Sequence, residues 1–267
     1  MEKWTLEAPE QLTFGPVESL EVRIVAGRLA VLASDGPPTL ELTEIESAAP
    51  LLVSYDELTK ELVIAYEGLT WDGLLGWLKR DRRRTNLTIT VPRGCRVNAE
   101  VVSASTVLAG FERSTRVKSV SSEVVLDGVS GEVSASTVSG SIESRAMDGD
   151  LSMKTVSGEL TLADGTPRRL KASTVSGRIT ADLALRPTSH VTFNSVSGAI
   201  LVRVPENVET DVSVRSTSGR LSSTFDELSV ESSPGSKTLS GRLGGGMASL
   251  SAHTVSGEVA LLKGEKE

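Results

Sequence analysis

The stretch that decides the fold is Leu151-Ser152-Met153-Lys154-Thr155-Val156-Ser157-Gly158-Glu159-Leu160-Thr161-Leu162. Apolar residues alternate with polar ones on both sides of its centre, and a period of two is typical of a β-strand with one buried face. The central Ser-Gly pair indicates a turn. The stretch therefore predicts a strand, a tight turn and a second strand.

The central Thr-Val-Ser-Gly motif recurs along the chain, with glycines 18, 19, 21, 21, 22 and 16 residues apart. A repeat of this length indicates a fold of stacked units, because one unit cannot bury its apolar face alone. Ser119-Val120-Ser121-Ser122 is an earlier, weaker copy. The predicted structural turn glycines are Gly140, Gly158, Gly177, Gly198, Gly219, Gly241 and Gly257.

Aligning the copies places like residues in columns. One column contains Val133, Leu151, Leu170, Val191, Val212 and Leu250, and another contains Ile142, Leu160, Ile179, Ile200, Leu221 and Val259. We expect each turn glycine to adopt a positive φ, which glycine tolerates best. We also expect the Thr or Ser that opens each motif to stack as a ladder of hydroxyl groups.

Two all-β architectures satisfy these columns. One is a β-solenoid, similar to a right-handed parallel β-helix, with rungs of 18–22 residues in most repeats. The other is a row of antiparallel hairpins. The sequence favours the solenoid, because like residues recur in column at the length of one rung.

The first third of the chain has strand patterns without the motif. The predicted strands are Leu20–Ile24, Leu29–Leu32, Thr39–Thr43, Leu51–Tyr55, Leu62–Tyr66 and Leu87–Val91. We expect residues 1–96 to form an N-terminal β cap with the first rungs, and residues 97–267 to form the repeat array. The two parts are predicted to make one continuous domain in which the cap covers the first strand edge.

One segment, residues 69–84, departs from the strand pattern and is predicted to be a short inserted helix. Trp71, Leu74, Leu75 and Leu78 follow the spacing of an apolar helical face. Trp77 adds another aromatic ring, and the basic residues that follow are Lys79, Arg80, Arg82, Arg83 and Arg84. These ten residues are the candidate interaction segment, and it has three interpretations. It docks on the array, lies on an anionic membrane surface, or binds a partner protein or nucleic acid.

Composition narrows the class of function. The net charge of −7 argues against general nucleic-acid binding, which requires a basic face. Cys95 is the only cysteine, so no disulfide can form within the chain. No apolar stretch has the length of a signal peptide or membrane span, so we expect a cytoplasmic protein, with contact at the inner face of the membrane as an alternative.

The sequence offers little catalytic chemistry. His190 and His253 are the only histidines, and each is predicted to lie on a strand surface. One cysteine and two separated histidines cannot supply a zinc tetrad. The candidate carboxylates fall mainly in turns, where aspartate is favoured for local hydrogen bonds, and they are Asp127, Asp148, Asp150, Asp164 and Asp182. We therefore expect no catalytic, metal-binding or cofactor-binding residues, no cofactor and no enzymatic activity.

The serial Thr-Val-Ser-Gly units, which follow the opening Leu20–Val31, resemble the bacterial DUF4097 family, also called the putative adhesin or toastrack family. The resemblance covers Val17 to Leu262. It implies a β-helical fold and a scaffold or interaction module without a catalytic site. It also implies a link to transmembrane segments or envelope-stress regulators, although this chain contains no such apolar segment.

The resulting prediction is a non-enzymatic scaffold or interaction module in envelope-stress or membrane-associated signalling. It would bind protein partners, including copies of itself, through the faces or ends of the solenoid. One alternative is a peripheral membrane protein held by residues 69–84. A less favoured alternative is a β-helix that binds or cleaves carbohydrate.

Overall fold

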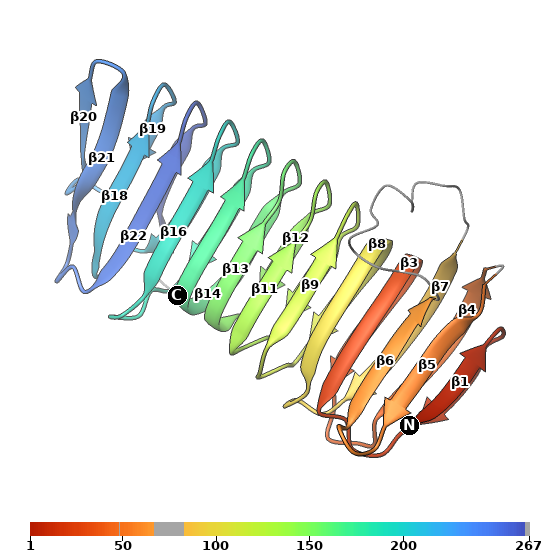
Figure 1. Ribbon diagram of the computed structural model, residues 1–267. Helices are drawn as coiled ribbons and strands as arrows, with labels where there is room; N and C mark the ends of the chain where they lie inside the picture. The colour runs from red at the N-terminus through yellow and green to blue at the C-terminus, as the bar shows by residue number, and fades with distance from the viewer. Residues whose placement is uncertain (48, 67–82, 265–267) are drawn as a thin grey trace. The chain divides into compact units, whose positions relative to one another are not determined.

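The computed structural model describes residues 1–47, 49–66 and 83–264, and the regular secondary structure in these ranges consists of β-strands. The chain divides into two compact units, Met1–Gly131 and Glu132–Glu267. Each unit contains two ladders of hydrogen-bonded strands, which form two layers (Figure 1).

The second unit contains the clearest repeats. Its first ladder runs through β11 (Glu132–Ser136), β13 (Asp148–Lys154), β14 (Leu160–Thr174), β16 (His190–Ser195), β22 (Ala248–Thr254) and β18 (Thr210–Ser216). Its second ladder runs through β12 (Ile142–Arg145), β14, β15 (Ile179–Leu183), β17 (Ile200–Pro205), β23 (Val259–Gly264) and β19 (Leu221–Ser223). Strand β14 is long enough to serve both ladders.

The strands of these ladders pair in parallel, with like residues opposite one another. Leu151 lies opposite Val133 on one side and Leu170 on the other, as the first predicted column requires. Ile179 lies opposite both Leu160 and Ile200, as the second column requires. The repeats of this unit therefore stack on one another and do not pair as a row of antiparallel hairpins.

The order of the strands in space differs from their order in the sequence. Strand β22 lies between β16 and β18, which Figure 1 shows as a dark blue strand among paler ones. Leu250 is opposite Val191 and Val212 at once. In the second ladder, β23 lies in the same way between β17 and β19. The C-terminal repeat is therefore an internal rung of its unit.

Two antiparallel strands follow β18. Strand β21 (Ser236–Leu243) pairs with β18, and β20 (Ser229–Ser233) pairs with β21. The prediction for Gly241 was wrong, because this residue lies within β21 opposite Val212 and not in a turn. A β-carbon at Gly241 would lie 2.6 Å from the carbonyl oxygen of Glu227, so close packing explains the glycine.

The first unit also has two ladders. Its first ladder contains β1 (Glu2–Leu6), β5 (Leu51–Asp56), β6 (Glu61–Tyr66), β3 (Ser19–Ala33), β8 (Arg96–Ala109) and β9 (Thr115–Ser119). Its second ladder contains β2 (Glu10–Thr13), β4 (Thr39–Glu46), β7 (Arg84–Val91), β3, β8 and β10 (Val124–Asp127). In these ladders, β3 pairs in parallel with β6, β7 and β8, whereas β1, β5 and β6, and likewise β2, β4 and β7, pair antiparallel. All six segments predicted as strands in the first third of the chain are in strands, but the first two, Leu20–Ile24 and Leu29–Leu32, belong to the single strand β3.

The first half of β3 pairs with β6, and its second half pairs with β7. The chain crosses from one ladder to the other near Gly27, whose φ is 110° and where a β-carbon would lie 2.1 Å from the Thr85 carbonyl oxygen. Strand β8 begins at Arg96 and pairs along most of its length with β3. The boundary between the compact units follows Gly131, whereas the strand patterns had indicated a division near residue 96.

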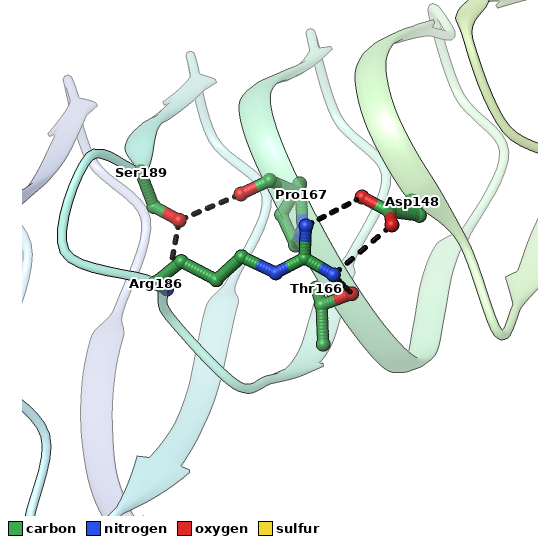
Figure 2. Close-up of polar contacts among 5 residues, drawn as sticks. All are labelled: Asp148, Thr166, Pro167, Arg186 and Ser189. Carbon is green, nitrogen blue, oxygen red and sulfur yellow. Dashed lines mark hydrogen bonds and ion pairs between the residues drawn. The ribbon is translucent and has the colours of Figure 1, made fainter.

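In the second unit, an arginine joins three successive repeats on the side of the rungs away from the Thr-Val-Ser-Gly turns (Figure 2). The Arg186 guanidinium donates hydrogen bonds of 3.1 and 3.0 Å to the Asp148 carboxylate and one of 3.1 Å to Thr166 Oγ1. The buried Ser189 hydroxyl donates to the Pro167 carbonyl oxygen at 2.7 Å and accepts from the Arg186 amide at 2.9 Å. These contacts fix the bends that follow β12, β15 and the first part of β14.

Candidate interaction surfaces

The Thr-Val-Ser-Gly turns of the second unit stack directly on one another, and we call this stack the corner column. It consists of residues 137–140, 155–158, 174–177, 195–198, 254–257 and 216–219, in spatial order. A β-carbon added to Gly158, Gly177 or Gly198 would lie only 1.7–1.8 Å from the carbonyl oxygen of the preceding turn glycine. Contact between successive turns therefore requires glycine here.

The expected positive φ at these glycines was wrong. None of the glycines of the corner column is among the described residues with a positive φ. The expected ladder of threonine hydroxyls was also wrong, because Thr155 Oγ1 accepts a hydrogen bond from the Gly158 amide of its own turn at 2.9 Å. The serine hydroxyls connect successive turns, and Ser176 Oγ donates to the Val156 carbonyl oxygen at 3.4 Å.

The valines of the corner column point outward. The side chains of Val138, Val156, Val175, Val196 and Val255 are each 46–49% exposed. Each valine stands one repeat from the next, so their methyl groups form a continuous stripe, which we call the valine stripe. Alignment of the repeats places these valines in one frame, but their outward orientation was not predicted from the sequence.

Among known protein families, the model of the toastrack DUF4097 family matches residues 79–262, which include the whole corner column. The chain belongs to the toastrack family. None of the curated proteins compared with it matches.

Several solved structures match the chain at low sequence identity. A putative adhesin from Bacteroides fragilis is 9% identical, with 97% of each chain covered and a TM-score of 0.43. A putative lipid binding protein from Parabacteroides distasonis is 13% identical, with 97% of each chain covered and a TM-score of 0.46. A putative cell adhesion protein from Clostridium sporogenes is 13% identical, with 96% of this chain and 99% of that chain covered and a TM-score of 0.32.

Most of the candidate interaction segment lies outside the described residues of this toastrack protein. This applies to the predicted helix as far as Arg82 and to Trp71, Leu74, Leu75, Trp77, Leu78, Lys79, Arg80 and Arg82. Two basic residues of the segment are described. The Arg83 guanidinium lies 5.5 Å from the centre of the Tyr66 ring, and Arg84 begins β7. The chain leaves the first ladder after Tyr66 and joins the second ladder at Arg84.

The ionisable groups considered for chemistry are dispersed over this toastrack fold. His190 and His253 lie on exposed positions of β16 and β22, as predicted. Asp150 and Asp182 form ion pairs with Arg168 and Arg203. Within the described ranges, no three His, Cys, Asp or Glu residues are grouped in a way that could hold a metal ion.

Cys95 is buried, and desolvation raises the pKa of its thiol to about 12, against a weaker opposing effect of the nearby Arg96. Because the thiolate is the nucleophilic form, this cysteine is protonated and unreactive at neutral pH.

The described part of the chain contains no helix long and apolar enough to cross a membrane.

Proposed function

We propose that this toastrack protein is a non-enzymatic interaction module, in which a β-solenoid presents the valine stripe to a protein partner. The observation that carries the proposal is the repeated exposure of Val138, Val156, Val175, Val196 and Val255 along one column. Continuous exposed apolar surface on a soluble protein is typical of a binding site. We place the module in envelope-stress or membrane-associated signalling, as the family resemblance implies, and the cytoplasmic location stays a prediction.

A helix with an apolar face is the partner structure that suits the stripe best. Neighbouring strands lie about 4.8 Å apart, and the valines repeat at that spacing. An α-helix places side chains on one face with a pitch of about 5.4 Å, whereas alternate residues of an extended strand are about 6.7 Å apart. A helix therefore departs from the valine spacing by about 0.6 Å per repeat, against about 1.9 Å for a strand, and its side chains can match the valines over two or three repeats.

Site-specific photo-cross-linking in the cells that make this protein tests the proposal. With a photoreactive residue at Val175, we expect one discrete cross-linked protein. Changing Val156→Lys and Val196→Lys in the same chain should reduce that product at least about fivefold, because a charged group is costly to bury against apolar side chains. The matched control is Val230, which is 49% exposed on β20 but lies outside the valine stripe.

Two results would contradict a docking site at the valine stripe. One is an equal yield of the same product from Val230, which would show that exposure alone determines the cross-link. The other is a product from Val175 that both lysine changes leave undiminished. The lysine variants must keep the thermal unfolding midpoint of the parent, which we expect because the altered side chains are half exposed.

A second candidate function is peripheral membrane binding through residues 69–84. The position of two cations of this segment favours it. The Arg83 guanidinium stacks on the Tyr66 ring, and Arg84 is the first residue of β7. Basic residues near an anionic surface contribute about 1 kcal/mol each, and tryptophan favours the membrane interface.

Co-sedimentation with phosphatidylglycerol vesicles tests this second function. The parent chain should bind, with an affinity that falls as salt is added. Trp71→Ala combined with Arg82→Glu and Arg83→Glu should weaken binding at least tenfold, through lost insertion and charge repulsion. Arg83→Glu alone is the control for loss of the Tyr66 contact. Absence of binding by the parent at low salt would eliminate this candidate.

A further inference from the structure

The outward side of the first ladder in the second unit carries an excess of positive charge. It displays Lys154 on β13, Arg169 and Lys171 on β14, and Arg215 on β18, all of them exposed. We call these four residues and the polar side chains between them the cationic face. The whole chain has a net charge of −7, so this charge is a local feature.

The cations of this face are available to a ligand. Among the described residues, no acidic side chain forms an ion pair with Lys154, Lys171 or Arg215. Arg169 has only a contact of 4.0 Å with Asp150, which Arg168 already binds at 2.6 Å. Asp211, the acid nearest the far end, is bound by Arg242 at 2.7 Å. Both of these acids therefore have arginine partners, whereas two further exposed acids, Glu132 on β11 and Glu231 on β20, lie beyond the two ends of the face.

The outward side of the second ladder provides the contrast. Two of its arginines are paired with acids, Arg145 with Glu143 and Arg203 with Asp182, and Arg220 lies 4.0 Å from Glu258. It also displays apolar side chains such as Leu201. Among the described residues, exposed cations without an acidic partner are therefore more numerous on the outward side of the first ladder than on this side, which contains Arg178, although both ladders come from the same repeats.

The polar side chains between the cations form regular rows across the strands. One row places Lys154, Ser173, Asn194, His253 and Arg215 on successive strands β13, β14, β16, β22 and β18. With neighbouring strands about 4.8 Å apart, the two cations at its ends stand about 19 Å from each other. The row beside it contains Ser152, Lys171, Thr192, Ser251 and Ser213 on the same strands.

Hydrogen bonds across the strands hold several of these side chains in place. Asn194 Nδ2 donates to Ser173 Oγ at 3.4 Å, and the hydroxyls of Thr192 and Ser251 lie 3.1 Å apart. These contacts reduce the side-chain entropy that a ligand would otherwise have to overcome. The face is therefore an ordered surface of hydroxyl and amide groups with positive charges among them.

From this arrangement, we propose that the cationic face binds a linear acidic polysaccharide of the uronic-acid type, laid across the strands. Carboxylates that recur along such a polymer would pair with the lysines and arginines, and the sugar hydroxyls would exchange hydrogen bonds with the serine, threonine and asparagine side chains. Several weak charge contacts on one polymer add up through multivalency.

The composition of the face favours this ligand over other polyanions. Peripheral membrane binding combines positive charge with buried apolar side chains, and the two rows contain none. Binding of single-stranded nucleic acid relies on aromatic side chains that stack on the bases, and the two rows contain no Phe, Tyr or Trp. Neutral polysaccharides would lack the carboxylates that the cations require.

The test measures binding of polygalacturonate to the full chain by calorimetry at low salt, with dextran as the neutral polymer. We expect the parent to bind polygalacturonate, more weakly as salt is raised, and not to bind dextran. Lys154→Glu, Lys171→Glu and Arg215→Glu together should weaken binding at least tenfold, since three attractions become repulsions. A neutral variant carries Lys154→Gln, Lys171→Gln and Arg215→Gln. It should lose less affinity than the charge-reversed variant, and it keeps the test valid if the charge-reversed chain fails to fold.

The matched control reverses three arginines in or beside the second ladder, Arg145→Glu, Arg178→Glu and Arg220→Glu, which changes the net charge by the same amount. We expect this variant to keep its affinity within about threefold, because screening weakens charges on the opposite side. An equal loss in this control would overturn the assignment to the cationic face. No binding by the parent, or equally tight and equally sensitive binding of phosphatidylglycerol vesicles or duplex DNA, would overturn the assignment to an acidic polysaccharide.

Discussion

Gly177→Ala is expected to destabilise this protein by about 3–5 kcal/mol or to prevent the second unit from folding. The new β-carbon would lie 1.8 Å from the Gly158 carbonyl oxygen and 2.9 Å from Thr174 Oγ1. The obstacle is backbone held by the stacked turns, so no side chain can rotate away to relieve the clash. Chemical denaturation followed by circular dichroism measures the loss.

Gly94→Ala is the matched control for this change. No heavy atom lies within 4 Å of the position that its β-carbon would take, and its φ is not positive. We expect the stability to stay within about 0.5 kcal/mol of the parent or to rise slightly, since alanine restricts the unfolded chain more than glycine does. If Gly177→Ala cost no more than Gly94→Ala, the close stacking of the turns would be wrong.

Removing the C-terminal repeat should unfold far more than the residues removed. In a chain that ends at Met247, β18 loses its partner β22, and β19 loses β23. Leu250, Val259 and Leu261 are buried in the intact protein and stabilise it by about 1.5–3 kcal/mol each. The summed loss for the three residues is comparable with the free energy of unfolding of a typical domain.

Hydrogen exchange followed by mass spectrometry reports this effect by segment. We expect β18 and β21 to lose protection together with the truncated end, although both precede the cut in the sequence. A chain that ends at Gly264 is the control and should exchange like the parent. If β18 stayed protected, Val212 would have moved opposite Val191, as the order of the repeats in the sequence allows, and the inserted position of β22 would not be essential.

The strands and their register were predictable because they depend on local pattern. The alternation of residues around Thr155–Gly158 identified both strands of a rung, and the repeat length alone correctly placed Leu151 opposite Leu170. In the first unit, the same reasoning identified the strand segments that form both halves of β3. It could not show that these halves pair with β6 and β7, because pairing depends on residues distant in the chain.

The turn glycines show where sequence reasoning reached the right residue for the wrong reason. A Ser-Gly pair suggested a positive φ, but the glycines are required by the neighbouring turn, as the contact between Gly177 and Gly158 shows. Gly241 matched the motif and still lies within a strand, because β21 pairs with the edge of β18. A short motif cannot distinguish a turn from a strand when tertiary contacts supply the partner.

The sequence by itself determined the strands and turns of the Thr-Val-Ser-Gly repeats and favoured stacked rungs with Leu151, Leu170 and Val191 in one column, because alternation and repeat length are local properties of the chain. Only the tertiary structure decided that the final repeat inserts between β16 and β18, since rungs with such similar sequences can pair in more than one order. It also decided which polar positions share a surface. Lys154 and Arg215 are far apart in the chain, and the pairing of strands places them in one row of the cationic face.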